Sequence, residues 1–317
     1  MRQGGRNMDR QTAVIRQKSL KKRIYQYRYV YLLALPGVLF FFCFKIFPMW
    51  GVILSFEKFK VSKGVFGSAW VGFENYINFF KNRNFLPMLR NTLAISSINL
   101  FLGFPLPIIL AILLNEIRGQ TYKKVVQTFV YLPHFMSWVV IGGLTFFIFS
   151  VDIGVVNKIL VELGREKVSI LTDPKLFWWI LFGQSTWREL GWGSIVYLAA
   201  ISQIDQTLYE AAKVDGASKL RQIIHVTIPG MMPTIIVMFI MRLGTVLDTG
   251  IEQLMLMSNT FVADVAQTFD LYAYQQGIQQ GNYSISVTVS VCKGLVGLLL
   301  VVMSNRAIKK TGNEGMF

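Results

Sequence analysis

The sequence has few of the residues that carry chemistry in enzymes and metal sites. It contains two cysteines and two histidines in 317 residues, and His134 and His225 stand far apart. Cys43 and Cys292 lie in apolar runs without a nearby Cys or His partner, so we expect buried apolar side chains rather than a metal site or disulfide framework. No nucleophile is paired with a base, and no glycine-rich loop ends in Lys-Ser or Lys-Thr. We therefore predict that the chain is not an enzyme, binds no metal or cofactor, and cannot hydrolyse ATP alone.

Charged residues are also scarce. They make up 15% of the chain, whereas hydrophobic residues make up 53%, and the mean hydropathy is +0.46. These values are typical of a membrane protein. The apolar runs are continuous rather than alternating, which excludes a transmembrane barrel, and backbone groups must be paired within lipid. The predicted fold class is therefore an all-α integral membrane protein.

Six transmembrane helices are predicted. They cover residues 29–56, 91–114, 125–149, 177–201, 230–257 and 283–303. Pro105 and Pro107 should bend the second helix, because each proline removes a backbone donor. The fourth is the weakest span, since it contains Gln184, Arg188 and Glu189. We expect one membrane domain, residues 29–304, between tails of residues 1–28 and 305–317.

The basic residues predict the orientation. Residues 1–28 hold nine lysines and arginines against a single acidic residue, Asp9. Other basic residues end the chain and fill the loop after the second helix: Arg118, Lys123, Lys124, Arg306, Lys309 and Lys310. The loop of residues 57–90 is basic too, but longer loops follow the charge rule less well. Both termini are therefore expected to be cytoplasmic, in a multi-pass protein of the cell membrane. A nucleic-acid partner is not expected, because the basic tail adjoins an apolar span, where it meets membrane lipid.

A polar segment, residues 205–228, separates the fourth and fifth helices. Asp205 is predicted to cap a short helix that Gly216 ends, and Ser218 could cap a second short helix. Pro229 should close this unit and begin the fifth membrane helix. Taken alone, the segment fits an amphipathic connector on the membrane surface as well as a docking element for another protein.

The spacing within this segment resembles a known signature. Glu210-Ala211-Ala212, three residues, Gly216, nine residues, then Val226-Thr227-Ile228-Pro229 is similar to the signature of binding-protein-dependent ABC importer permeases. The usual Ile-x-Leu-Pro ending appears here as Val-Thr-Ile-Pro. Segments 44–51, 70–76, 131–140 and 191–200 resemble the carbohydrate-uptake subfamily, and within it the lipoprotein-B-type permeases for fragments of complex or acidic polysaccharides.

The resemblance implies a fold, partners and a mechanism. It implies the type I importer permease fold and alternating access driven by a separate ATPase homodimer, which binds ATP and Mg. The other implied partners are a homologous second permease, giving a heterodimer, an extracellular solute-binding protein and an oligosaccharide substrate. The residues implied to couple the chain to the ATPase are Glu210, Ala211, Ala212, Asp215, Gly216, Ala217 and Pro229. The alternative is an ion-coupled secondary transporter or channel, against which the structured polar segment and the lack of visible inverted repeats both count.

Polar residues inside membrane helices are costly and usually face a cavity or a partner helix. Three predicted helices carry them at one-face spacing, which predicts a shared sugar path. The candidates are His134, Ser137, Trp138, Ser185, Arg188, Glu189, Trp192, Arg242, Thr245, Thr249 and Glu252, with Asp248 at the edge.

Two interpretations of these residues stay open at this point, an ion-pair network between helices and direct contact with sugar. Arg188 and Glu189 are sequence neighbours and should not pair with each other. We expect Arg188 to pair with Asp248 or Glu252, and Glu189 to pair with Arg242. Aromatic rings and an arginine would suit a sugar and a uronate carboxylate. His134 also fits an ordinary helix-end histidine, and Lys293 is expected either to line the path or to contact the second permease.

Overall fold

The computed structural model describes residues 25–312 and 315–316, so most of the predicted N-terminal tail lies outside the described residues. The chain divides into two units, residues 1–51 and 52–317, which are described separately. Apart from two short strands, the described elements are helical.

The first unit holds the N-terminal helix. α2 (Arg28–Phe41) continues through the π-helical η1 (Phe42–Ile46) into η2 (Phe47–Phe56), which enters the second unit. Together they form one helix that is long and apolar enough to cross a membrane, as predicted. No residue of α2 is buried and Cys43 is exposed, so the expectation of a buried Cys43 was wrong for this chain alone. Such an apolar helix requires lipid or a partner chain around it.

The second unit begins with a small folded segment rather than a plain loop. It comprises β1 (Glu57–Lys58), α3 (Gly64–Gly67), β2 (Ala69–Trp70) and α4 (Glu74–Phe80). The two strands pair antiparallel, with Glu57 opposite Trp70. The buried Asn75 amide donates to the carbonyls of Ser55 and Glu57, both at 2.9 Å, which fixes α4 on this hairpin.

Three further helices of the second unit are long and apolar enough to cross a membrane. They are α5–η3–α6 (Phe85–Ile98, Asn99–Gly103, Pro105–Glu116), α12–η5–α13 (Lys219–Gln222, Ile223–Thr227, Ile228–Gly244) and α17 (Tyr283–Lys310). α10 (Pro174–Ser202) matches the predicted fourth helix but is not among them. The described helices therefore support four to five of the six predicted spans.

Pro233 lies inside α13, but two other prolines follow π-helical turns. η3 ends at Gly103, two residues before Pro105, and η5 ends at Thr227, two residues before Pro229. Each proline then falls in the first turn after the π-helical turn, where its missing N–H needs no partner within that helix. Pro229 was therefore wrongly expected to close a separate unit, since the helix runs on from Lys219 to Gly244.

The predicted third and fifth helices are both broken. α7 (Gln120–Tyr131) and η4 (Leu132–Phe135) meet α8 (Trp138–Phe149) at 101°, because Met136 is extended and Ser137 begins a new helix. α13 ends at Gly244 rather than at residue 257, and the chain is not helical from Thr245 to Gly250. Gly250 has φ +79°, a left-handed conformation that a helix interior does not allow.

The remaining elements are short. α9 (Val155–Glu162) follows α8, and α11 (Gln206–Val214) follows α10. After the break come α14 (Ile251–Met257), η6 (Thr260–Val262), α15 (Ala263–Ala266), α16 (Phe269–Tyr274) and η7 (Gln275–Gln279). α17 ends at Lys310 instead of the predicted residue 303.

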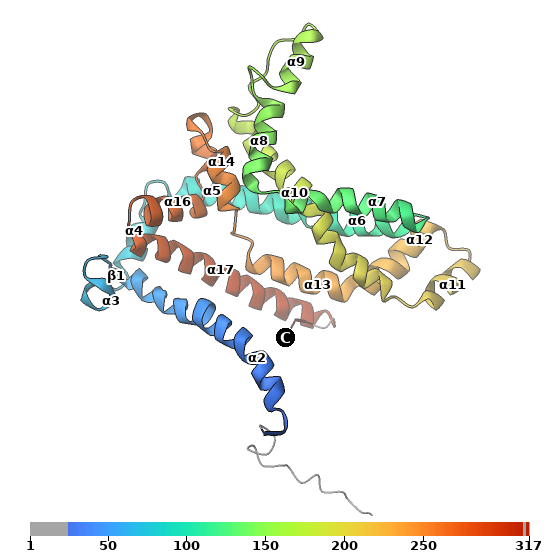
Figure 1. Ribbon diagram of the computed structural model, residues 1–317, viewed down its shortest axis with the longest axis horizontal. Helices are drawn as coiled ribbons and strands as arrows, with labels where there is room; N and C mark the ends of the chain where they lie inside the picture. The colour runs from blue at the N-terminus through green and yellow to red at the C-terminus, as the bar shows by residue number, and fades with distance from the viewer. Residues whose placement is uncertain (1–24, 313–314, 317) are drawn as a thin grey trace, which may run out of the picture. The chain divides into compact units, whose positions relative to one another are not determined.

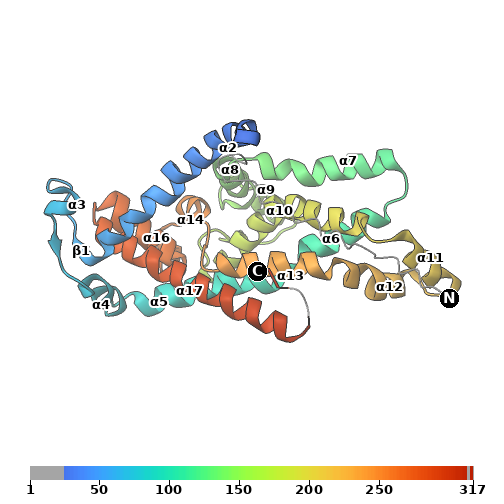
Figure 2. The ribbon, with the colours of Figure 1, turned by 90° about the horizontal axis from the view of Figure 1, so that it is seen from below.

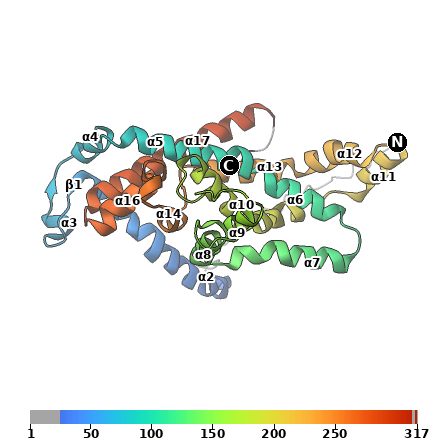
Figure 3. The ribbon, with the colours of Figure 1, turned by 90° about the horizontal axis from the view of Figure 1, so that it is seen from above.

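The long helices of the second unit form a layer. α7, α10, α13 and α17 follow one another side by side, with α6 along α10 (Figures 2 and 3). Ala111, Tyr197 and Met231 are buried where α6, α10 and α13 meet. α17 approaches α13 closely at Gly297, where a Cβ would collide with the Gly244 carbonyl. α11 and α12 lie at one end of this layer, and β1, α3 and α4 at the opposite end (Figure 1).

Candidate functional site

The polar segment begins with the predicted helix cap. The Asp205 carboxylate accepts a hydrogen bond from the Thr207 N–H at 2.9 Å, and α11 starts at Gln206, directly after Asp205. This bond to the backbone lowers the pKa of Asp205, because it stabilises the charged carboxylate. The sequence-based prediction of an N-cap at Asp205 is confirmed.

Gly216 ends α11 in a Schellman motif. Its φ is +72°, and the N–H groups of Gly216 and Ala217 donate to the carbonyls of Lys213 (3.0 Å) and Ala212 (2.8 Å). The predicted helix stop at Gly216 is confirmed. Ser218 stands at the N-cap of α12 as predicted, but its side chain makes no capping hydrogen bond.

The polar segment exposes a compact surface. Glu210, Ala211, Asp215 and Gly216 are exposed, whereas Ala212 and Ala217 are half-buried. Val214, beside them, is 88% exposed and so presents an apolar side chain on this surface. Pro229 stands apart from this group, inside the continuous helix at the start of α13.

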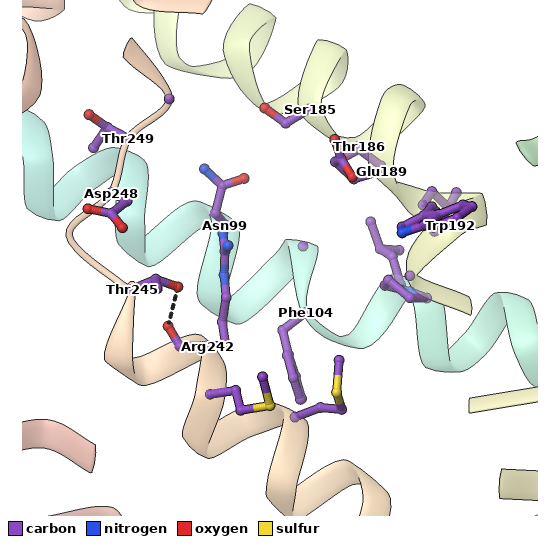
Figure 4. Close-up of a pocket in the computed structure, with 18 of the residues that line it drawn as sticks. Asn99, Phe104, Ser185, Thr186, Glu189, Trp192, Arg242, Thr245, Asp248 and Thr249 are labelled. Carbon is purple, nitrogen blue, oxygen red and sulfur yellow. Dashed lines mark hydrogen bonds between the residues drawn. The ribbon is translucent and has the colours of Figure 1, made fainter. Parts of the chain in front are cut away.

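A pocket with a largely apolar lining and several polar side chains lies among α6, α10, α13 and α14. Its volume is about 580 Å³. Of the sequence candidates, Trp138, Ser185, Glu189, Trp192, Arg242, Thr245 and Thr249 line it. Figure 4 shows Ser185, Thr186, Glu189 and Trp192 along α10, with Arg242, Thr245, Asp248 and Thr249 across the pocket and Asn99 between them. His134, Ser137, Arg188 and Glu252 do not line the pocket.

Arg188, Glu189 and His134 form one cluster at the break between η4 and α8. Arg188 pairs with its neighbour Glu189, so the expectation that these two should not pair was wrong. Glu189 also contacts His134 Nδ1 at 3.1 Å, and the Arg188 Nε donates to the Met136 carbonyl at 3.2 Å. The Arg188 side chain is long enough to reach both groups, which the spacing of Cβ positions along a helix does not predict.

Aromatic rings complete this cluster. The Arg188 guanidinium lies 4.9 Å from the centre of the Trp138 ring. The His134 ring stacks on Trp192, with centroids 4.4 Å apart and an angle of 2° between planes. His134 is thus held in a turn by contacts with side chains, while Ser137 caps α8 by accepting from the Val140 N–H at 3.3 Å. For Arg188 and His134, these contacts favour a network of paired side chains over direct contact with a sugar.

Arg242 differs from every other charged residue of the pocket. In the described part of the chain no carboxylate lies within 4.0 Å of its guanidinium, so the expected pair with Glu189 does not form. The expected pairs of Arg188 with Asp248 or Glu252 do not form either. Glu252 is exposed on α14.

Three polar residues that line the pocket, Asn99, Thr186 and Gln253, were not predicted from the sequence, whereas Asp248 was expected at the edge of the polar stripe and does line it. The Gln253 amide donates to the Leu181 carbonyl and to the Gln184 side chain, both at 2.8 Å. The amide of Asn99, within an apolar helix, and that of Gln253 are the signal that could have identified these two residues.

Lys293 of α17 is explained by two carboxylates. Its ammonium lies 2.7 Å from Asp248 and also pairs with Asp270 of α16. Asp270 accepts a hydrogen bond from the Thr249 N–H at 2.7 Å, which fixes the non-helical residues 245–250 against α16. Among the described residues no group of three or more Cys, His, Asp and Glu is arranged to hold a metal ion.

Comparisons with known proteins cover nearly the whole chain. It is 44% identical over 309 residues to the polygalacturonan/rhamnogalacturonan transport system permease protein YteP of Bacillus subtilis, covering 96% of each chain. It is 45% identical over 290 residues to protein LplB of the same organism, covering 92% of this chain and 91% of that protein.

Solved structures share the fold. A chain of a bacterial alginate ABC transporter, in complex with an alginate pentasaccharide-bound periplasmic protein, superposes with a TM-score of 0.85 and 35% identity. The match covers 94% of this chain and 100% of that chain. Residues 103–310 match the family described as binding-protein-dependent transport system inner membrane component. The chain therefore belongs to this family, and it is a membrane-embedded permease subunit of an ABC importer rather than an enzyme.

Proposed function

We propose that this permease moves acidic oligosaccharides through the pocket between α6, α10, α13 and α14 by alternating access. Its partners are a homologous second permease, with which it forms a heterodimer, a solute-binding protein outside the cell, and an ATPase homodimer that binds ATP and Mg. The chain crosses the cell membrane six times, with residues 205–228 and both termini in the cytoplasm. The type of permease and the fold of its relatives support this assembly.

The ATPase docks on α11 and the turn at Gly216. The capped helix and its Schellman turn present a preformed surface, and Val214 is an apolar contact that the chain itself does not cover. Glu210, Ala211, Ala212, Asp215 and Ala217 surround that residue. Pro229 acts at a distance, within the continuous helix through which movement of residues 219–227 reaches the rest of α13.

The observation that carries the substrate class is Arg242. It is the pocket-lining cation without a carboxylate partner among the described residues, so it is free to pair with a carboxylate that enters. A guanidinium binds a carboxylate through two parallel hydrogen bonds, which suits a uronate. Trp138 and Trp192 also line the pocket and offer aromatic surface to a sugar ring.

The pocket and the relatives agree with this class. A volume of about 580 Å³ lies within the range of ligand sites, roughly 300–1,000 Å³. A second solved structure with a TM-score of 0.84 is that of an ABC transporter that imports the acidic polysaccharide alginate, and one curated relative transports polygalacturonan and rhamnogalacturonan.

The test compares Arg242→Gln with the conservative Arg242→Lys. The complete transporter is reconstituted in vesicles, and uptake is measured for an acidic and a neutral oligosaccharide of equal length. Arg242→Gln should raise the KM for the acidic sugar by about 10–100-fold relative to the neutral one, and Arg242→Lys should raise it less. Equal changes for both sugars, or none, would remove Arg242 from substrate recognition.

A further inference from the structure

Both carboxylates that line the pocket are paired with a cation that does not line it. Glu189 is paired with Arg188, and Asp248 is paired with Lys293 at 2.7 Å. Arg242, in contrast, lines the pocket without a paired carboxylate among the described residues. Of the three charged side chains that line the pocket, Arg242 is therefore the one without an ion-pair partner, and the pairing of the other two depends on Arg188 and on Lys293, which Asp248 shares with Asp270.

Lys293 is buried in a way that suits such a role. Its side chain is 12% exposed, and it bridges Asp248 with the nearly buried Asp270. The Asp248 side chain is 63% exposed and faces the pocket. Without Lys293, one or two carboxylates would remain uncompensated at the pocket wall, and they would repel an anionic sugar.

The same cluster also holds the backbone of the pocket. Asp270 accepts hydrogen bonds from the N–H of Thr249 at 2.7 Å and from its hydroxyl at 3.0 Å. The Thr249 hydroxyl lies 3.2 Å from that of Thr268. Lys293 and Asp270 thus contribute both to the charge at the pocket wall and to the position of its backbone, so an experiment must separate these two effects.

We propose that Lys293 determines selectivity for anionic sugars by neutralising Asp248 from behind the pocket wall. This inference rests on the proposed function, since it assumes that sugar passes through this pocket. Lys293 does not touch the sugar in this mechanism. It leaves Arg242 as the pocket-lining charge without an ion-pair partner, so that the pocket attracts a uronate rather than a neutral ring.

The experiment measures the ratio of KM for acidic and neutral oligosaccharides of equal length, with the complete transporter in vesicles. Lys293→Gln should raise this ratio about tenfold. Adding Asp248→Asn to that variant should return the ratio to within about threefold of wild type, because the uncompensated carboxylate that lines the pocket is gone, whereas Asp270 does not line it. Raising the salt concentration should shrink the shift in Lys293→Gln.

A purely structural role gives a different pattern. If Lys293→Gln impairs both sugars equally, the ratio of KM values stays unchanged and the inference is overturned. A raised ratio that Asp248→Asn does not restore overturns it as well. If Lys293→Gln fails to assemble, Asp248→Asn alone decides, since Lys293 keeps Asp270 as a partner. That variant should lower the ratio about threefold, and an unchanged ratio overturns the inference.

Arg242→Gln in the same assay separates this inference from the proposed function. If Arg242→Gln shifts the ratio and the Lys293 and Asp248 variants do not, only the role of Lys293 is refuted. If Arg242→Gln has no effect, recognition of acidic sugar by Arg242 is refuted, while a shift in Lys293→Gln that Asp248→Asn reverses still supports the role of Lys293.

Discussion

Replacing Gly216 tests whether the Schellman turn is what the ATPase recognises. Gly216 has φ +72°, and a Cβ placed on it would meet no atom within 4 Å. The cost of a substitution is therefore backbone strain rather than a collision within the chain. A residue with a Cβ in this left-handed region costs roughly 1–2 kcal/mol, asparagine tolerates the region better, and a β-branched residue tolerates it least.

These costs translate into docking affinity. A penalty of about 1–2 kcal/mol lowers the equilibrium constant for the native turn by roughly 5–30-fold, and the apparent affinity falls by up to that factor, in full where the native turn is a minor conformation. Gly216→Asn should bind the ATPase nearly as well as wild type, Gly216→Ala should fall into that range, and Gly216→Val should lose docking. Insertion into the membrane should stay normal, because the turn lies outside the apolar spans.

The assay is a titration of the purified ATPase onto vesicles that contain the permease pair. Asparagine serves as the matched control, since its side chain is larger than alanine but fits the backbone better. Equal affinity of wild type and Gly216→Val would refute the docking proposal. A loss that follows side-chain size, with asparagine worse than alanine, would mean direct contact at Gly216 rather than a requirement for the turn.

Two further predictions test helix packing and helix capping. Gly297→Ala should lower the melting temperature of the solubilised protein, because the new Cβ meets the Gly244 carbonyl, with a cost of about 1–3 kcal/mol. Gly294→Ala in the same helix has open space and should not lower it, so equal melting temperatures for the two variants would contradict the close approach. The lowered pKa of Asp205 means that its cap is complete above the ordinary carboxyl pKa and is lost as pH falls through the lowered value. Asp205 therefore stays charged between pH 7 and about 5, and its cap should not make ATPase docking depend on pH in this range. Asp205→Ala should weaken docking at every pH, whereas Asp205→Asn keeps an acceptor and should not.

The parts of the fold that depend on neighbouring residues were predictable from the sequence. Asp205 and Gly216 mark the two ends of α11 because a cap and a left-handed turn are satisfied within a few residues. Four of the six apolar spans, and a fifth as a bent pair, were predictable as well, because a helix that crosses lipid needs a long run of apolar residues. In contrast, the helical spacing of polar residues could not locate the end of α13, because no proline follows Gly244 and the polar stripe continues to Glu252.

Partners of charged residues were not predictable. Lys293 meets Asp248 and Asp270 only because α16, α17 and the break after α13 come together in the fold. Arg188 reaches Glu189 because its side chain is long and flexible, which spacing alone does not describe. The pocket itself was anticipated for seven of its lining residues, but which charges stay unpaired there depends on tertiary contacts.

The predicted third and fifth helices, which were expected to be continuous, are broken beside the pocket. At each break a charged side chain forms a hydrogen bond with the backbone. Arg188 donates to the Met136 carbonyl at the first break, and Asp270 accepts from the Thr249 N–H at the second. Non-helical backbone within a membrane persists only where its polar groups are paired or line a cavity. Arg188 and Asp270 therefore support the backbone beside the pocket without lining it, and under the proposed function recognition is left to the lining residues that have no such role. Among the described charges that line the pocket, that residue is Arg242.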